Sequence, residues 1–385
     1  LLGMPRRVYT YQEGLGWEPW NLASTLGAYV VAIGFAVVAL DLILHLRISG
    51  KSRGNPWNAG TLEWLPMDNY ATRSIPHVRS RDPLWDEPQL AEEVEQGRHY
   101  LPGTATGERE TIVTHPVSAQ PQYLMILPGP SWLPVLSGIG TALFFLALTF
   151  KLTVPAILLG AFTVAMIVRW LWSTDRSGPY PPVEIGGGIR LPVGMTGPSS
   201  HAWWAVVVLI LVDVTIFACL AFSYFYLWTT NPQSAWPPAG FSLSPGWFAA
   251  LIVGSWAASS ALIEWAGRAL RGNTLSRARL TWGLCAALLL ASAAFATSLL
   301  AQGNSESGAS DHAYGAIVFT ILAYQGFHVV IVLAMAGYTL TRAWFGLLDP
   351  ARRMPFDSTR LLWHYMVAQG VVSALIIELA PRFLS

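Results

Sequence analysis

The chain has 385 residues, of which 53% are hydrophobic and only 12% are charged. Its net charge of +1 at pH 7 gives no reason to expect a nucleic-acid partner. A composition this apolar excludes an ordinary soluble domain and predicts an all-α membrane protein. Each membrane-spanning helix needs about 20 mostly apolar residues.

Eight segments are long and apolar enough to be such helices. In chain order they are Leu22–Leu46, Leu133–Phe150, Val154–Trp172, Trp203–Trp228, Gly246–Leu270, Leu280–Ala301, Tyr314–Trp344 and Leu361–Leu384. A long polar insert, Arg47–Pro130, separates the first segment from the other seven. This division of one helix and seven indicates a fusion of two membrane units.

The polar insert is rich in proline and acidic residues, as in RSRDPLWDEPQLAEEVEQGRHY at positions 79–100. We predict a short helix near Leu90–Gly97 and an extended linker elsewhere. The predicted organisation is therefore a first domain at 1–64, a cytoplasmic linker at 65–128 and a seven-helix domain at 129–385.

Basic residues concentrate in alternate loops between the predicted spans. In these loops and at the adjoining span ends, they include Arg47, Lys51, Arg53, Arg176, Arg190, Arg268, Arg271, Arg277, Arg279, Arg342, Arg352, Arg353 and Arg360. Because Lys and Arg accumulate on the cytoplasmic side, we expect the insert to be cytoplasmic and both chain ends to lie outside. Arg6 and Arg7 would then oppose the trend, which indicates a specific role for this pair.

Four ionisable side chains within the spans are candidate functional residues, because such groups are costly in a membrane. Asp213 either makes a structural hydrogen bond or takes part in lipid binding or proton delivery. Glu264 has the same two possible functions, or else it forms an ion pair with Arg268, four residues later. His328 and His364 are either packed, hydrogen-bonded histidines or lipid contacts.

Motifs near the start of the chain resemble the end of subunit I of haem–copper cytochrome c oxidases. These are GMPRR at 3–7, WN at 20–21 and NPWNAGTLEW at 55–64. Two residues depart from the commoner pattern of the family, where Thr10 and Gln12 replace an Asp and a Pro. The resemblance implies that Arg6 and Arg7 contact haem propionates; the alternative is a pair that binds lipid headgroups or caps a loop.

Motifs from about Gly129 onward resemble subunit III of the same family, in the same order and with seven helices. They include LVDVTIFACLAFSYFYL at 211–227, WPPAGF at 236–241, DHAYGAIVFTILAYQGFHV at 311–329 and WHY at 363–365. Asp213 stands where the family usually has Glu, and Gln325 replaces a His. The join resembles the fused subunit I and III polypeptides of some bacterial oxidases.

The resemblance implies a component of a bacterial aerobic terminal oxidase, in the inner (plasma) membrane, that reduces O₂ to water and pumps protons. Subunit III is redox-inactive in this family and supports assembly, lipid binding and proton uptake. Asp213, Glu264, His328 and His364 are the candidates for the last two roles. No catalytic or metal-binding residue is expected in this chain.

Cofactors and partners follow from the same resemblance. Haem and copper are expected in the complete complex and not in this chain alone, since its histidines form no ligand set. The expected partners are the remainder of subunit I, subunit II, cytochrome c and phospholipids. We interpret the chain as the C-terminal part of a longer polypeptide or a split-gene product. The alternatives are a quinol-oxidising or nitric-oxide-reducing relative, or a non-enzymatic transporter or scaffold.

Overall fold

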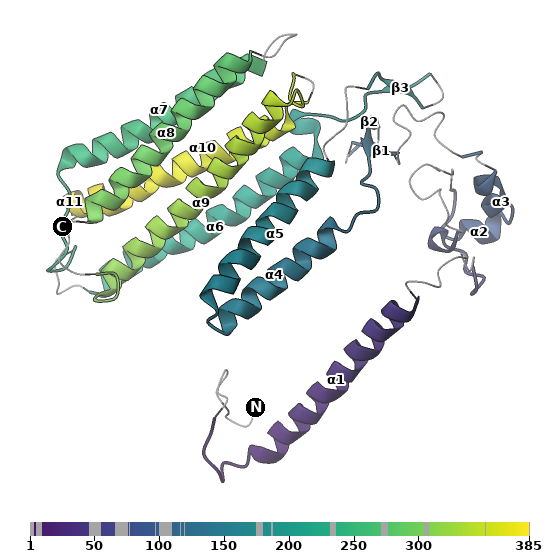
Figure 1. The fold of residues 1–385 in the computed structure, drawn as a ribbon, viewed down its shortest axis with the longest axis horizontal. Coiled ribbons are helices and arrows are strands. Elements are labelled where there is room, and N and C mark those ends of the chain that lie inside the picture. The colour runs from purple at the N-terminus through teal and green to yellow at the C-terminus, as the bar shows by residue number, and fades with distance from the viewer. Residues whose placement is uncertain are drawn as a thin grey trace. The chain divides into compact units, whose positions relative to one another are not determined.

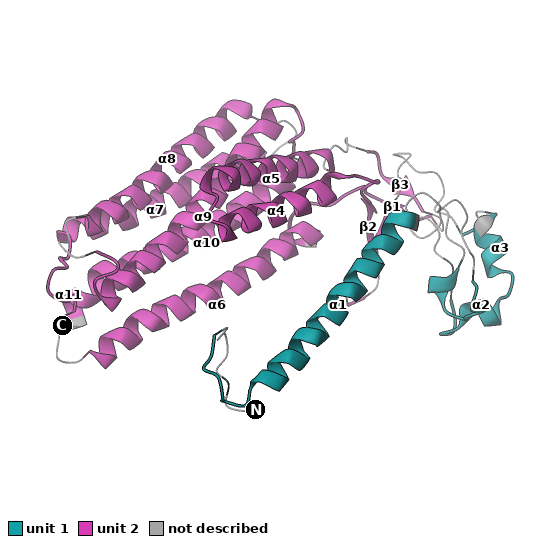
Figure 2. Cartoon of the chain, turned by 60° about the horizontal axis from the view of Figure 1, so that its bottom comes forward, with its two compact units in different colours: residues 1–101 teal, residues 102–385 magenta. Residues whose placement is uncertain are grey.

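The computed structural model describes residues 4, 10–45, 55–65, 76, 78–96, 98–99, 110–115, 117–118, 120–174, 180–185, 188–231, 236–270, 276–303, 308–350 and 352–384. It is 70% helical, which confirms the predicted fold class. The chain divides into two compact units, residues 1–101 and residues 102–385 (Figure 2).

The first unit contains one long helix, α1 (Glu18–His45), of 28 residues. Its side chains are apolar on every side and exposed within the unit, so the helix needs an apolar environment all round. The 3₁₀ turn η1 (Leu62–Trp64) and the short helices α2 (Pro83–Asp86) and α3 (Leu90–Glu95) follow. Leu65, Leu90 and Val94 form a small core there. The short helix predicted near Leu90–Gly97 is thus confirmed as α3.

The second unit begins with a β-hairpin that the sequence did not reveal. Strands β1 (Glu110–Thr114) and β2 (Pro121–Ile126) pair antiparallel. Leu124 also bridges Val193, next to the short pair β3 (Val183–Glu184) and β4 (Arg190–Leu191). The prediction of an extended linker is therefore wrong over this segment. Its β-branched and aromatic residues favour strands, and Tyr123 and Leu124 become buried.

Among the described residues, eight helices then follow, and they lie close to the seven remaining predicted spans. They are α4 (Leu133–Thr149), α5 (Thr153–Thr174), α6 (His201–Thr230), α7 (Gly246–Gly267), α8 (Arg277–Gln302), α9 (Ala313–Trp344), α10 (Met354–Ala374) and α11 (Ala380–Leu384). The turns η2 (Gly197–Ser199) and η3 (Arg268–Leu270) are 3₁₀-helical, and η4 (Leu375–Leu379) is a π-helical turn that joins α10 to α11. With α1, seven described helices are long and apolar enough to cross a membrane. The remaining predicted span, Leu133–Phe150, corresponds to α4, which has 17 residues.

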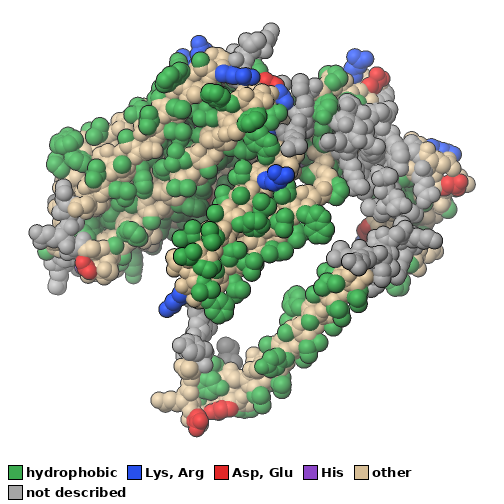
Figure 3. Space-filling view, viewed as in Figure 1, with side chains coloured by type: hydrophobic (Ala, Val, Ile, Leu, Met, Phe, Trp, Pro, Cys, Tyr) green, Lys and Arg blue, Asp and Glu red, His purple; other side chains and the backbone are tan. Residues whose placement is uncertain are grey.

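Helices α6 to α10 lie side by side, and α4 and α5 form a hairpin of their own (Figure 1). The main core lies between α7, α8, α9 and α10, and its large side chains include Trp256, Leu284 and Trp363. Gly283 allows α8 to approach α7 closely, since a Cβ atom there would lie 2.6 Å from the Cβ of Ala266. Hydrophobic side chains cover the outward helix faces in view, and most charged ones lie near helix ends (Figure 3).

Candidate functional site

Asp213 on α6 forms the centre of a partly buried polar cluster with two residues of α9. Its Oδ1 accepts a hydrogen bond from the Tyr324 hydroxyl at 2.7 Å. Its Oδ2 lies 3.2 Å from Nε2 of His328, and Nδ1 of His328 lies 3.0 Å from the carbonyl of Tyr324. The His328 side chain is 1% exposed and that of Asp213 is 15% exposed. The structure thus brings together two candidates that the sequence identified separately.

The hydrogen bonds around His328 fix how many protons this pair holds. The Tyr324 carbonyl can only accept, so Nδ1 of His328 carries a proton. A second proton lies between Nε2 and Asp213, on either the imidazole or the carboxyl group. The pair is neutral overall in both arrangements, as a membrane interior favours. The geometry therefore accommodates one shared proton between Nε2 of His328 and Oδ2 of Asp213.

Glu264 and His364 form a second polar cluster, between α7 and α10. Oε1 of Glu264 lies 2.9 Å from Nε2 of His364 and 3.6 Å from Nε of Arg360. The hydroxyl of Ser260 lies 2.8 Å from Nδ1 of His364. Both side chains of the Glu264–His364 pair are more than a third exposed. The sequence predicted Arg268 as the partner of Glu264. Packing of α10 on α7 instead brings Arg360 and His364 to this carboxylate.

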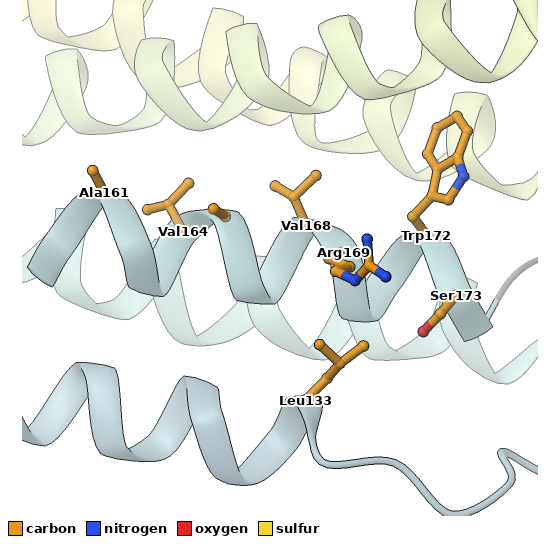
Figure 4. Close-up of a pocket in the computed structure, with 8 residues that line it drawn as sticks. Leu133, Ala161, Val164, Val168, Arg169, Trp172 and Ser173 are labelled. Atoms are coloured by element: carbon orange, nitrogen blue, oxygen red, sulfur yellow. The ribbon is translucent and has the colours of Figure 1, made fainter.

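A third feature is an apolar groove that sequence reasoning missed. It has a volume of about 820 Å³ and is lined by residues of α5 together with Leu133 at the start of α4. Figure 4 shows Ala161, Val164 and Val168 along the groove, with Arg169 and Trp172 near its end. Arg169 is exposed, and no described residue pairs with it. The sequence did carry one signal for this groove, which is the single charge of Arg169 within a long apolar segment.

Trp172 joins the α4–α5 hairpin to the rest of the unit. Its ring packs edge-on against Tyr338 and Phe345, at centroid distances of 5.9 and 5.5 Å. The guanidinium carbon of Arg342 lies 5.6 Å from the centre of the same ring, a cation–π contact. The groove therefore lies beside the point where α5 is fixed to α9.

Arg6 and Arg7 lie outside the described residues, so the structure gives no geometry for a haem-propionate contact. Among the described residues, no group of three or more His, Cys, Asp or Glu side chains is placed to bind a metal ion.

Most of the second unit matches a known protein family. Residues 189–373 match the family model for cytochrome c oxidase subunit III. The chain carries a subunit III domain. The matched segment runs from β4 to the end of α10, so the subunit III domain contains both polar clusters.

The N-terminal region matches a different subunit. It is similar to cytochrome c oxidase subunit 1 of Bacillus subtilis strain 168, with 43% identity over 94 residues, covering 23% of this chain and 15% of that protein. Quinol oxidase subunit 1 of the same strain is 37% identical over 90 residues, covering 21% and 14%. A probable quinol oxidase subunit 1 of Staphylococcus aureus strain USA300 is 36% identical over 109 residues, covering 26% and 15%.

These matches confirm the resemblance seen in the motifs: a segment like subunit I precedes the subunit III domain on one polypeptide. The chain spans about 15% of the length of the subunit 1 proteins that it matches. Its homology and its apolar helices make it a multi-pass membrane protein.

Proposed function

We propose that this chain is a component of a bacterial aerobic terminal oxidase that supplies the end of subunit I and the whole of subunit III. The observation that carries the proposal is the presence of both likenesses, in this order, on one chain. The proposed enzyme is a cytochrome c oxidase that reduces O₂ to water and pumps protons across the plasma membrane. The remaining partners are the rest of subunit I, subunit II, cytochrome c and phospholipids.

The proposed domain boundaries are 1–64 for the subunit I-like part, 65–128 for a cytoplasmic linker and 129–385 for subunit III. The family model begins at residue 189, and α4 and α5 precede it. Two observations support their inclusion: both are apolar helices within the second compact unit, and α5 packs against α9 through Trp172. The basic residues support an N-terminal loop and a C-terminus on the outer side.

The role of the subunit III domain is to support proton uptake and lipid binding. The neutral Asp213–His328 pair supports the first role, because it holds a proton inside the helix bundle without a net charge. Glu264 and His364 provide a second, more exposed cluster. The groove along α5 supports the second role, since its apolar walls fit acyl chains and Arg169 fits an anionic headgroup.

The subunit I-like part would contact haem through Arg6 and Arg7. A guanidinium group is planar and permanently charged, and it matches a carboxylate with two parallel hydrogen bonds. In the complete enzyme, electron transfer and oxygen reduction belong to haem and copper. The contribution of this chain is then to hold the propionates.

The electron donor is tested by purifying the complex that contains this chain. Oxygen consumption is measured with reduced cytochrome c and, separately, with a reduced quinol. We expect turnover with cytochrome c that cyanide abolishes. Turnover with quinol alone would identify the complex as a quinol oxidase. The two matches to quinol oxidase subunit 1 are the reason to test this alternative. A purified complex that holds this chain but no haem would contradict the oxidase assignment.

A further inference from the structure

A small cavity at the end of the bundle where α10 meets η4 carries an inference that goes beyond the proposed function. It lies between α7, α8, α9 and α10, and about 10 Å³ within it is open to the centre of a water molecule. That volume is enough for about one water. Trp256, Gln325, Ser373 and Glu378 are among the lining residues, and each is at most 4% exposed.

Three polar atoms of this lining have no hydrogen-bond partner among the described residues. They are the indole nitrogen of Trp256, Oε1 of Gln325 and the hydroxyl of Ser373. The orientation of the Gln325 amide is fixed, because its Nε2 donates to the carbonyl of Met366 at 3.1 Å. Since buried polar groups are nearly always paired in folded proteins, three orphans around one cavity point to a ligand.

Glu378 supplies a fourth polar group to the same cavity, and it lies in the π-helical turn η4. Its Oε2 accepts from the Ser244 hydroxyl at 2.5 Å, and its Oε1 accepts from Nε2 of Gln302 at 2.8 Å. Each carboxylate oxygen has further lone pairs, so Glu378 can accept another hydrogen bond. π-Helical turns frequently occur at functional sites.

We propose that this cavity binds one ordered water molecule that joins α7, α9 and α10 to the turn η4. The donor and acceptor counts match: the indole N–H and the Ser373 hydroxyl donate, while Gln325 Oε1 and the Glu378 carboxylate accept. A water molecule accepts two hydrogen bonds and donates two, so it satisfies all three orphan atoms at once. Gly370 keeps the site open, since a Cβ there would lie 2.5 Å from Cε2 of Trp256.

The first test is the structure of the purified complex that contains the full chain, at a resolution that shows ordered water. We expect one density peak in the cavity, within about 2.7–3.2 Å of Gln325 Oε1, Ser373 Oγ and a carboxylate oxygen of Glu378. An empty cavity in that map would overturn the proposal.

The second test is the melting temperature of Ser373→Ala. With water present, the variant loses a hydrogen bond and melts at a lower temperature than the parent. In a dry cavity, it only removes an unpaired buried hydroxyl, so the melting temperature stays the same or rises. Ser298→Ala is the matched control, because Ser298 lines the same cavity but already donates to the Ala294 carbonyl at 2.9 Å. A Ser373→Ala variant at least as stable as the parent would contradict the proposal.

Discussion

Nε2 of His328 lies 3.2 Å from Oδ2 of Asp213, although the two residues are 115 positions apart in the sequence. The contact joins α6 to α9, and the Tyr324 hydroxyl completes it from the other side of the carboxyl group. Neither residue alone suits a membrane interior, whereas the pair is neutral and hydrogen-bonded. The relationship therefore explains how α6 tolerates an acidic residue in an otherwise apolar stretch.

Two variants can separate the role of Asp213 in holding a proton from its role in stabilising the structure. Asp213→Ala removes both hydrogen bonds and should destabilise the chain by about 1–3 kcal/mol. Asp213→Asn keeps the shape, since its carbonyl can accept from Tyr324 and its amide can donate to His328. We expect both variants of the complete complex to retain their haem spectra and to lose activity sooner during turnover. A normal active lifetime for Asp213→Asn would restrict this residue to a structural role.

Arg169 should determine how firmly phospholipid is held in the groove along α5. A basic residue near a membrane surface attracts anionic lipid by about 1 kcal/mol, so Arg169→Gln should weaken retention about fivefold. Arg169→Lys keeps the charge and should retain more lipid than the Gln variant. Mass spectrometry of the lipids that co-purify with the complex measures this. Arg268→Gln is the control, because Arg268 is also exposed but does not line the groove; equal losses in both Gln variants would contradict a specific site.

Arg7 should affect the redox potential of haem in the complete enzyme. If it pairs with a propionate, the charge-assisted contact is worth about 1.5–3 kcal/mol. Its loss in Arg7→Gln removes a positive charge, which makes haem reduction less favourable and lowers the midpoint potential. Arg7→Lys keeps the charge but loses the second hydrogen bond, so its shift should be smaller. Midpoint potentials that stay unchanged in both variants would favour a lipid-headgroup role for Arg6 and Arg7.

Tyr123 should make the stability of the second unit sensitive to alkaline pH. Burial raises the pKa of its hydroxyl above the ordinary 10.0, and the hydroxyl is hydrogen-bonded to Nδ1 of His201. Because the folded-state pKa is raised, this contribution is complete below pH 10.0 and is lost as the pH rises through the folded-state value.

We therefore expect Tyr123→Phe to be less stable than the parent at pH 8, with the difference shrinking above pH 10. Melting temperatures across this range provide the measurement. Tyr226→Phe is the comparison, since Tyr226 is 56% exposed. A parent–variant difference that stays constant with pH would contradict a pKa raised by burial.

The helices were predictable because a membrane span demands a long apolar run that few other structures need. The β-hairpin was not, because its strands are short and lie within a polar, proline-rich insert. Glu264 shows a further limit: the sequence favoured the local partner Arg268, but packing supplies Arg360 and His364, about 100 residues later. Asp213 and His328 were recognisable singly by their cost in a membrane, yet only the fold shows that they meet.

The length of α4 has a consequence for the lipid around the protein. Its 17 residues span about 25 Å, whereas the hydrocarbon core of a bilayer is about 30 Å thick. We expect this hydrophobic mismatch to thin the bilayer locally on the α4 side. Lipids with shorter acyl chains should accordingly gather along this flank, and the thinner layer brings their phosphates closer to the level of Arg169.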